Sequence, residues 1–144
     1  LKENADYAAE KGVKLLLENV WASYLISAFD VRNFLDEVNH PNVGSYFDVG
    51  NNVRWGVPEH WVQMLGKRIG KLDIKEFDID TQMNTGLRAA LQTPEIGEGS
   101  IDWAAVRQEL AAISFESWAT AEVRGGDRQR LAEIAERMDK VLDL

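Results

Sequence analysis

The sequence predicts an α/β protein built from parallel β/α units. Four short apolar runs, each four to six residues long, occur along the chain, and each is followed by turn residues and a helix-like segment. Strands that are buried on both faces have nearly continuous apolar sequences, and right-handed crossovers make such neighbouring strands parallel. Four such units form either half of an eightfold barrel or a small open sheet.

The first two units follow this order closely. Residues 6–11 have the pattern of a helix end, Gly12 is the expected stop, and a strand is predicted over 13–20. Apolar residues at helical spacing predict a helix over 30–39, and a second strand is predicted over 43–49.

The third unit begins at Pro58, a residue favoured in the first helical turn. Gly66 or Gly70 is expected to end this helix, and a strand is predicted over 69–77. The connection over 78–99 is too long for a minimal turn, so we expect a loop that covers a binding site. A surface insertion without function is the alternative, because loops accept insertions readily.

The fourth unit is predicted to have a helix on each side of its strand. Ser100 is the expected N-cap of a helix over 101–113, and a strand is predicted over 118–123. Asp127 is the expected N-cap of a final helix whose apolar face carries Leu131, Ile134, Met138 and Leu142.

An acidic residue lies at the C-terminal end of each apolar run: Glu18, Asp48, Asp73 and Glu122. In parallel α/β proteins ligands bind beyond the carboxyl ends of the strands, so we expect these four carboxylates to converge there. Any one of them alone is better explained as a solvated strand end. Their repetition at matching places favours a site.

Composition restricts the class of ligand. The 144 residues suit a single domain over 1–144, and a formal charge of -8 argues against binding to nucleic acid or to an anionic membrane surface. No apolar stretch approaches the ~20 residues that span a bilayer. The sequence has no cysteine, which excludes disulfides and thiolate metal sites and is compatible with a cytoplasmic location. We therefore expect a small polar ligand.

Five ordered segments resemble the second half of the sugar phosphate isomerase/epimerase family: LLLENVW (15–21), GSYFDVGN (44–51), LGKRIGKLDIKEFD (65–78), IGEGSIDW (96–103) and AEVRGGD (121–127). This family belongs to the xylose isomerase-like barrel superfamily, which also contains endonuclease IV. The resemblance implies that the chain supplies strands five to eight of a barrel, as a fragment of a longer (β/α)8 chain. It would then pair with an N-terminal half, or with a second copy as a homo-oligomer.

The resemblance also implies a divalent metal held by Glu18, Asp48, Asp73 and Glu122. The family usually has histidine where this chain has Asp73, so the ligands carry a formal charge of -4 instead of -3. An all-oxygen shell favours Mg²⁺, Mn²⁺ or Ca²⁺ over Zn²⁺, and among the family's metals we expect Mn²⁺, Mg²⁺ or Co²⁺ rather than Zn²⁺. Lys75, Arg124 or Arg88 is expected to offset part of the excess negative charge.

By the same resemblance, the chain is a metal-dependent isomerase or epimerase of a ketose or its phosphate. Glu18 and Glu122 would act as the two proton-transfer groups through an enediolate. The expected substrate-binding residues are Trp21, Asn51, Arg54, Lys75, Glu98 and Arg124.

Two alternatives stay open. The first is a noncatalytic fragment, or a relative whose metal site has degenerated with the loss of the histidine. The second, more remote, is a nuclease like endonuclease IV, which needs a histidine-rich zinc cluster. Neither His40 nor His60 falls on a motif position, and both are expected at the surface.

Overall fold

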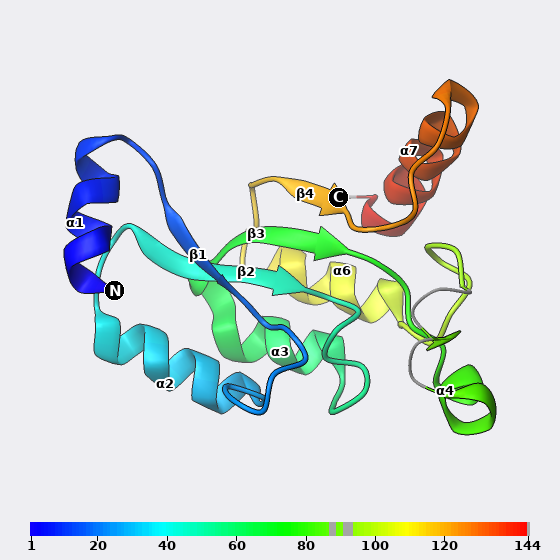
Figure 1. Ribbon diagram of the computed structural model, residues 1–144, viewed down its shortest axis with the longest axis horizontal. Helices are drawn as coiled ribbons and strands as arrows, with labels where there is room; N and C mark the ends of the chain where they lie inside the picture. The colour runs from blue at the N-terminus through cyan, green and yellow to red at the C-terminus, as the bar shows by residue number, and fades with distance from the viewer. Residues whose placement is uncertain (87–88, 91–93, 144) are drawn as a thin grey trace.

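Four parallel strands form one sheet in the computed structural model, which describes residues 1–86, 89–90 and 94–143 (Figure 1). Strand order follows chain order, and every neighbouring pair is parallel. The predicted α/β class with parallel units is therefore confirmed. The strands are β1 (Leu15–Glu18), β2 (Val43–Asp48), β3 (Ile69–Ile74) and β4 (Ala119–Ala121).

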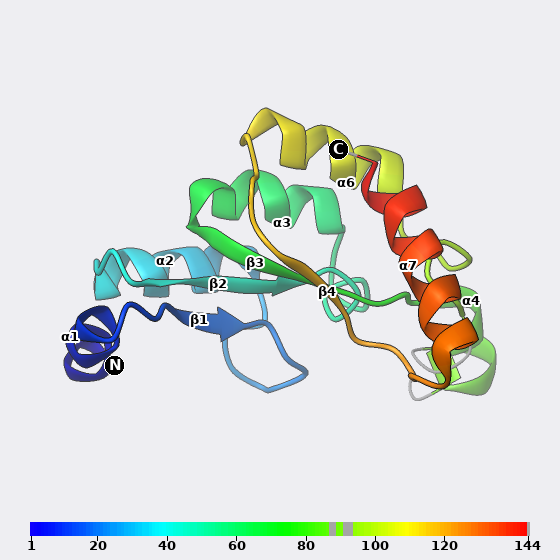
Figure 2. The same ribbon diagram turned by 90° about the horizontal axis from the view of Figure 1, so that it is seen from above.

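Three helices cover one face of this sheet, where α2 packs against α3 and α3 against α6 (Figure 2). The helix α7 contacts α6 and lies at the end of the sheet to which the strands point (Figures 1 and 2). None of the described helices is long and apolar enough to cross a membrane. The helices are α1 (Lys2–Glu10), α2 (Ala28–Val38), α3 (Pro58–Leu65), η1 (Gly66–Arg68), α4 (Ile79–Thr85), α6 (Trp103–Ala112) and α7 (Arg128–Leu142).

The hydrophobic core lies between the sheet and these helices. Phe47 and Leu72 are fully buried in neighbouring strands, and Phe47 stacks on Trp61 of α3 with ring centroids 5.9 Å apart. Side chains alternate between the two faces of a strand, so the residues on either side of Phe47 face away from the helices. That second face carries the candidate site.

A register shift between β2 and β3 leaves Gly70 without a partner in the pairing.

On the face away from the helices, the hydroxyl of Tyr46 in β2 lies 2.5 Å from Oγ1 of Thr120 in β4. Neighbouring strands are ~4.8 Å apart, so these two side chains bridge about 10 Å across β3. The contact ties together two strands that are not neighbours.

Several predicted element ends are confirmed by the structure. Gly12 adopts a left-handed conformation just after α1, Pro58 begins α3, and the side chain of Asp127 accepts a hydrogen bond from the Arg130 backbone as the N-cap of α7. All four strands are shorter than predicted, by one to four residues. The helix predicted from residue 30 begins two residues earlier, since Ser27 is its N-cap.

The prediction of Ser100 as an N-cap is wrong. The side chain of Asp102 accepts the hydrogen bond from the Ala105 backbone at 3.0 Å, and α6 begins at Trp103. Ser100 Oγ instead accepts a hydrogen bond from the Ile79 backbone at 3.0 Å, so it joins the start of α4 to the start of α6.

The connection over 78–99 is not the continuous loop that was predicted. It contains α4, whose N-cap Asp78 accepts a hydrogen bond from the Thr81 backbone at 2.7 Å. This helix has no buried residue, so apolar periodicity gave no signal for it. Arg88, expected as a countercharge, lies outside the described residues.

One residue on the predicted apolar face of the final helix is not buried. Leu131 is 56% exposed, whereas Ile134 and Val141 are buried. The buried residues lie seven positions apart, on one stripe of the helix.

Candidate metal centre

The four strand-end carboxylates come together at the C-terminal edge of the sheet. One oxygen from each of Glu18, Asp48, Asp73 and Glu122 lies within 4.8 Å of the others. Parallel pairing produces this convergence, because Asp48 and Asp73 are direct partners in register and β1 and β4 end on either side of them. We call these four residues the carboxylate cage.

The members of the cage differ in exposure. Asp48 is completely buried and Asp73 is 6% exposed, while Glu18 is partly buried and the Glu122 side chain is 56% exposed. The two aspartates therefore form the floor of the cage. The two glutamates lie closer to solvent, where a ligand can reach them.

Hydrogen bonds hold Asp48 firmly in this position. Its carboxylate accepts one bond from the Asn51 backbone at 2.8 Å and another from Asn51 Nδ2 at 2.9 Å. Its backbone exchanges two hydrogen bonds with the side-chain amide of Asn19, each 2.8 Å long. Both asparagines come from the loops that follow β1 and β2.

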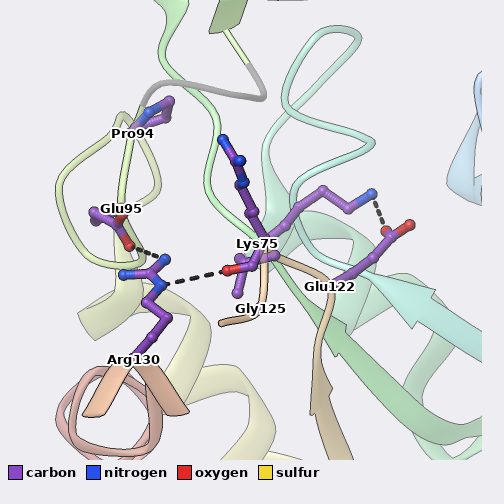
Figure 3. Close-up of a pocket in the computed structure, with 8 residues that line it drawn as sticks. Lys75, Pro94, Glu95, Glu122, Gly125 and Arg130 are labelled. Atoms are coloured by element: carbon purple, nitrogen blue, oxygen red, sulfur yellow. Dashed lines mark hydrogen bonds and ion pairs between the residues drawn. The ribbon is translucent and has the colours of Figure 1, made fainter. Parts of the chain in front are cut away.

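Lys75 places a positive charge inside the cage. Its ammonium group contacts Glu122 Oε2 (Figure 3). It also lies 2.9 Å from Asp48 Oδ2 and 3.3 Å from Asn51 Oδ1. An ammonium has three protons, and these three acceptors match them. The stem of Lys75 passes over Gly50, where a β-carbon would overlap its Cγ.

Burial and charge shift the pKa values in the cage. Burial raises the pKa of Asp48 to about 7, although Lys75 and the Asn51 backbone act in the opposite direction. Burial also raises the pKa of Glu18, with further contributions from Glu122 and Asp73. Burial lowers the pKa of Lys75, but the carboxylates of Asp48 and Glu122 outweigh it and raise that pKa above its ordinary value.

The cage fits a single divalent ion by size and by ligand type. Oxygens on opposite sides of Mg²⁺ are about 4.2 Å apart, and those around Ca²⁺ are about 4.6–5.2 Å apart. The 4.8 Å limit in the cage is compatible with both spacings. Four carboxylates provide only oxygen, which suits Mg²⁺, Mn²⁺ or Ca²⁺. An ion bound to Asp48 Oδ2 and Glu122 would have to displace the Lys75 ammonium, which uses the same oxygens.

A cavity of about 1050 Å³ opens beside the cage. Lys75 and Glu122 line one side of it, and Glu95 lines another, where its carboxylate is paired with Arg130 at 2.7 Å (Figure 3). Pro94 and Glu95 belong to the 78–99 connection, so the end of that segment contributes to the cavity wall. Arg124 also lines the cavity.

The predicted substrate-binding residues occupy different places. Asn51 and Lys75 contact the cage directly, and Trp21 donates a hydrogen bond from its indole to the Asn51 carbonyl at 2.9 Å. The guanidinium of Arg54 lies over the ring of Trp55 at 4.2 Å and over that of Trp21 at 5.9 Å. Glu98 is not among the cavity-lining residues, and its carboxylate is paired with Arg137 at 2.8 Å.

Two residues near the site were not singled out from the sequence. Thr120 donates a hydrogen bond to Asp73 Oδ1 at 3.2 Å. The sequence could have indicated Thr120, because it lies two residues before Glu122 and therefore on the same face of the strand. The buried carboxylate of Glu76 accepts hydrogen bonds from the Gly97 backbone at 2.8 Å and from the Trp103 indole at 2.9 Å. Glu76 thereby fixes the segment that leads to the cavity wall.

Together these features define a β/α protein with a carboxylate centre at the C-terminal edge of a parallel sheet. A sequence profile described as xylose isomerase-like TIM barrel matches residues 1–143. The chain belongs to this family. A comparison of the sequence with curated proteins found no match.

Solved structures share the fold over nearly the whole chain. A xylose isomerase domain protein from Planctomyces limnophilus matches with a TM-score of 0.74 and 20% identity, over 99% of this chain and 51% of that protein. A D-allulose 3-epimerase from Methylomonas sp. matches with a TM-score of 0.67 and 25% identity, over 93% and 44%. A probable 3-DHS dehydratase from Bacillus anthracis matches with a TM-score of 0.71 and 18% identity, over 96% and 53%. The chain spans about half the length of each of these proteins.

Proposed function

We propose that this chain carries the metal centre of a ketose isomerase or epimerase that acts on a sugar or a sugar phosphate. The observation that carries the proposal is the convergence of four strand-end carboxylates within 4.8 Å beside an open cavity. Family membership and similarity to an epimerase support the choice of chemistry.

In this proposal Glu18, Asp48, Asp73 and Glu122 hold a divalent ion, with Mn²⁺, Mg²⁺ or Co²⁺ favoured over Zn²⁺. When bound, such an ion polarises a substrate carbonyl and stabilises negative charge on its oxygen. Asp48 and Asp73 are buried and serve only as ligands. Glu18 and Glu122 are more accessible and have a second role.

That second role is proton transfer. One glutamate takes the proton from the carbon next to the carbonyl, and the electron pair of the broken C–H bond forms the double bond of an enediolate. The other glutamate then returns a proton to the opposite face of that carbon, which inverts it. Return to the neighbouring carbon isomerises the sugar instead. The raised pKa of Glu18 moves it toward the pH at which a carboxylate is an effective base.

The groups around the cavity are proposed to bind the substrate. Asn51 and Lys75 offer polar atoms at the cage, and Trp21 offers a flat apolar wall beside them. Arg124 lines the cavity and Arg54 lies next to Trp21, so both are candidates for a phosphate. Glu98 is the weakest candidate, because Arg137 already engages its carboxylate.

The test is solvent exchange of a carbon-bound proton. The protein loaded with Mn²⁺ is incubated in deuterated buffer with a panel of ketoses and their phosphates, and deuterium uptake next to the carbonyl is followed by NMR. We expect uptake with at least one substrate, and its loss in Glu18→Gln and Glu122→Gln. Glu116→Gln, a change at an exposed position outside the cage, is the matched control and should leave exchange intact. Absence of both metal binding and exchange would reject the proposal.

A noncatalytic chain, either a fragment or a relative whose metal site has degenerated, is the second candidate. The position of Lys75 favours a degenerated site, because its ammonium occupies oxygens that an ion would need. Absence of Mn²⁺ binding together with absence of exchange would support a degenerated site, and Mn²⁺ binding without exchange would support a noncatalytic fragment. An endonuclease IV-like activity has less support, because the cage contains no histidine, and His40 is engaged with Asp6 at 3.1 Å.

We also propose that further strands pair with the two edges of the sheet. Within the described residues, β1 and β4 each have a strand on one side only. Unpaired strand edges carry backbone donors and acceptors that favour association. The added strands would come from a longer chain, in which this segment forms strands five to eight, or from a second copy. A well-folded monomer of this chain in light scattering would contradict the proposal.

A further inference from the structure

The surroundings of Asp73 differ from those of Asp48. Asp48 receives two hydrogen bonds from Asn51 and an ion pair from Lys75. Within the described ranges, the carboxylate of Asp73 receives a hydrogen bond from Thr120 alone, on Oδ1 at 3.2 Å. Its second oxygen has no protein donor there, although the residue is only 6% exposed. That oxygen therefore keeps open acceptor positions, and a cation in the cage would occupy one of them.

The direction of the hydrogen bonds around Thr120 follows from the number of protons available. An ionised carboxylate only accepts, so the hydroxyl proton of Thr120 points to Asp73. That hydroxyl has no second proton, so the 2.5 Å contact with Tyr46 must use the phenolic proton of Tyr46. A competing acceptor, the Leu72 carbonyl, lies farther from Thr120 Oγ1 at 3.4 Å. The result is a chain of donors from Tyr46 to Thr120 to Asp73.

We propose that Thr120, supported by Tyr46, is a positioning residue that makes Asp73 a one-oxygen metal ligand; the inference rests on the proposed metal centre. The hydroxyl engages Oδ1 and leaves the other oxygen for the ion. Outer hydrogen bonds of this kind orient metal ligands, and their loss typically weakens metal binding 10–100-fold. A donor chain that ends in a hydroxyl suits an acceptor such as aspartate.

The proposed arrangement also affects the choice of ion. Ca²⁺ takes six to eight oxygens and often binds both oxygens of one carboxylate, whereas Mg²⁺ requires a smaller octahedral shell. Because its hydroxyl engages one oxygen of Asp73, Thr120 disfavours binding of an ion through both oxygens of that carboxylate. The hydroxyl therefore biases the cage toward the smaller ions Mg²⁺ and Mn²⁺.

The experiment measures Mn²⁺ and Ca²⁺ affinity by titration calorimetry, with no requirement for activity. Thr120→Val removes the hydroxyl at nearly constant volume and should weaken Mn²⁺ binding about 10–100-fold while weakening Ca²⁺ binding much less. Thr120→Ser keeps the hydroxyl and should restore Mn²⁺ affinity to near the wild-type value. Tyr46→Phe should give a smaller loss in the same direction. Thr85→Val, at the exposed end of α4, is the matched control and should change neither affinity.

A double-variant comparison separates positioning from general damage. In the Asp73→Asn background, Thr120→Val should cause little further loss, because the ligand that it positions is already altered. An equal loss in both backgrounds, or wild-type Mn²⁺ affinity in Thr120→Val, would overturn the inference and leave the metal centre standing. If Thr120→Val does not fold, Thr120→Ser and Tyr46→Phe still decide. A wild-type chain that binds neither ion would reject the metal centre, and the inference with it.

Discussion

Replacement of Lys75 by methionine should increase the metal affinity of the cage. The ammonium of Lys75 uses Asp48 Oδ2 and Glu122 Oε2, two oxygens that an ion would also require. Methionine keeps an unbranched stem over Gly50 but carries no charge. An ion entering the variant therefore has no ammonium to displace.

The magnitude follows from the contact with Asp48. A hydrogen bond to a charged group contributes about 1.5–3 kcal/mol when it is shielded from solvent. Asp48 is fully buried and the Lys75 side chain is 11% exposed, so this contact is counted in full. The contact with Glu122 is left out, because that side chain is 56% exposed and water screens it. Since 1.4 kcal/mol corresponds to a tenfold change, Lys75→Met should bind Mn²⁺ roughly 10–100-fold more tightly.

The assay is calorimetric titration with Mn²⁺ at pH 8.5. High pH is needed because the Lys75 charge helps to keep Asp48 ionised, and its removal raises the pKa of Asp48 beyond its value of about 7. Lys67→Met changes the net charge equally at an exposed position before β3, at the opposite end of the strand from the cage, and should leave the affinity unchanged. Equal or weaker Mn²⁺ binding by Lys75→Met would refute the idea that the ammonium and the ion compete.

Three further outcomes are expected. Burial raises the pKa of Asp48 to about 7, so a proton on Asp48 competes with the metal ion below that pH. Mn²⁺ affinity measured by calorimetry should therefore fall by up to about tenfold per pH unit between pH 7 and pH 5.5. An affinity that does not change with pH would contradict this prediction. Glu76→Gln places an amide among three donors and should lower the free energy of unfolding in urea by about 1–3 kcal/mol, whereas Glu116→Gln at an exposed position should change it little. Gly50→Ala should lower the melting temperature and alter Mn²⁺ affinity, because its β-carbon would overlap the stem of Lys75; unchanged values for both would show that this close approach is unimportant.

Much of this arrangement could be predicted from the sequence because it depends on strand order and strand ends. Parallel strands in chain order bring their last residues to one edge, so the sequence alone predicts that Asp48 and Asp73 lie together, as their pairing in the sheet confirms. The helix α4 could not be predicted in this way, because it buries none of its residues and has no apolar stripe.

The contacts of the Lys75 ammonium could not be predicted from the sequence pattern either. Strand periodicity places Lys75 on the same face as Asp73, but it does not say where a long flexible side chain ends. Its ammonium reaches Asp48 on the neighbouring strand because Gly50 leaves room for the stem. The hydroxyl pair of Tyr46 and Thr120 depends on contact across β3, which no local pattern encodes.

The order of the strands gives the cage a property that matters for protein evolution and engineering. Its four carboxylates come from consecutive strands that are also neighbours in the sheet, between Glu18 and Glu122. No strand from elsewhere separates them, so recombination at the borders of this segment would transfer the whole cage with its internal geometry. A library that joins this segment to different partner segments would therefore vary the surrounding chain while keeping the geometry of the four carboxylates constant.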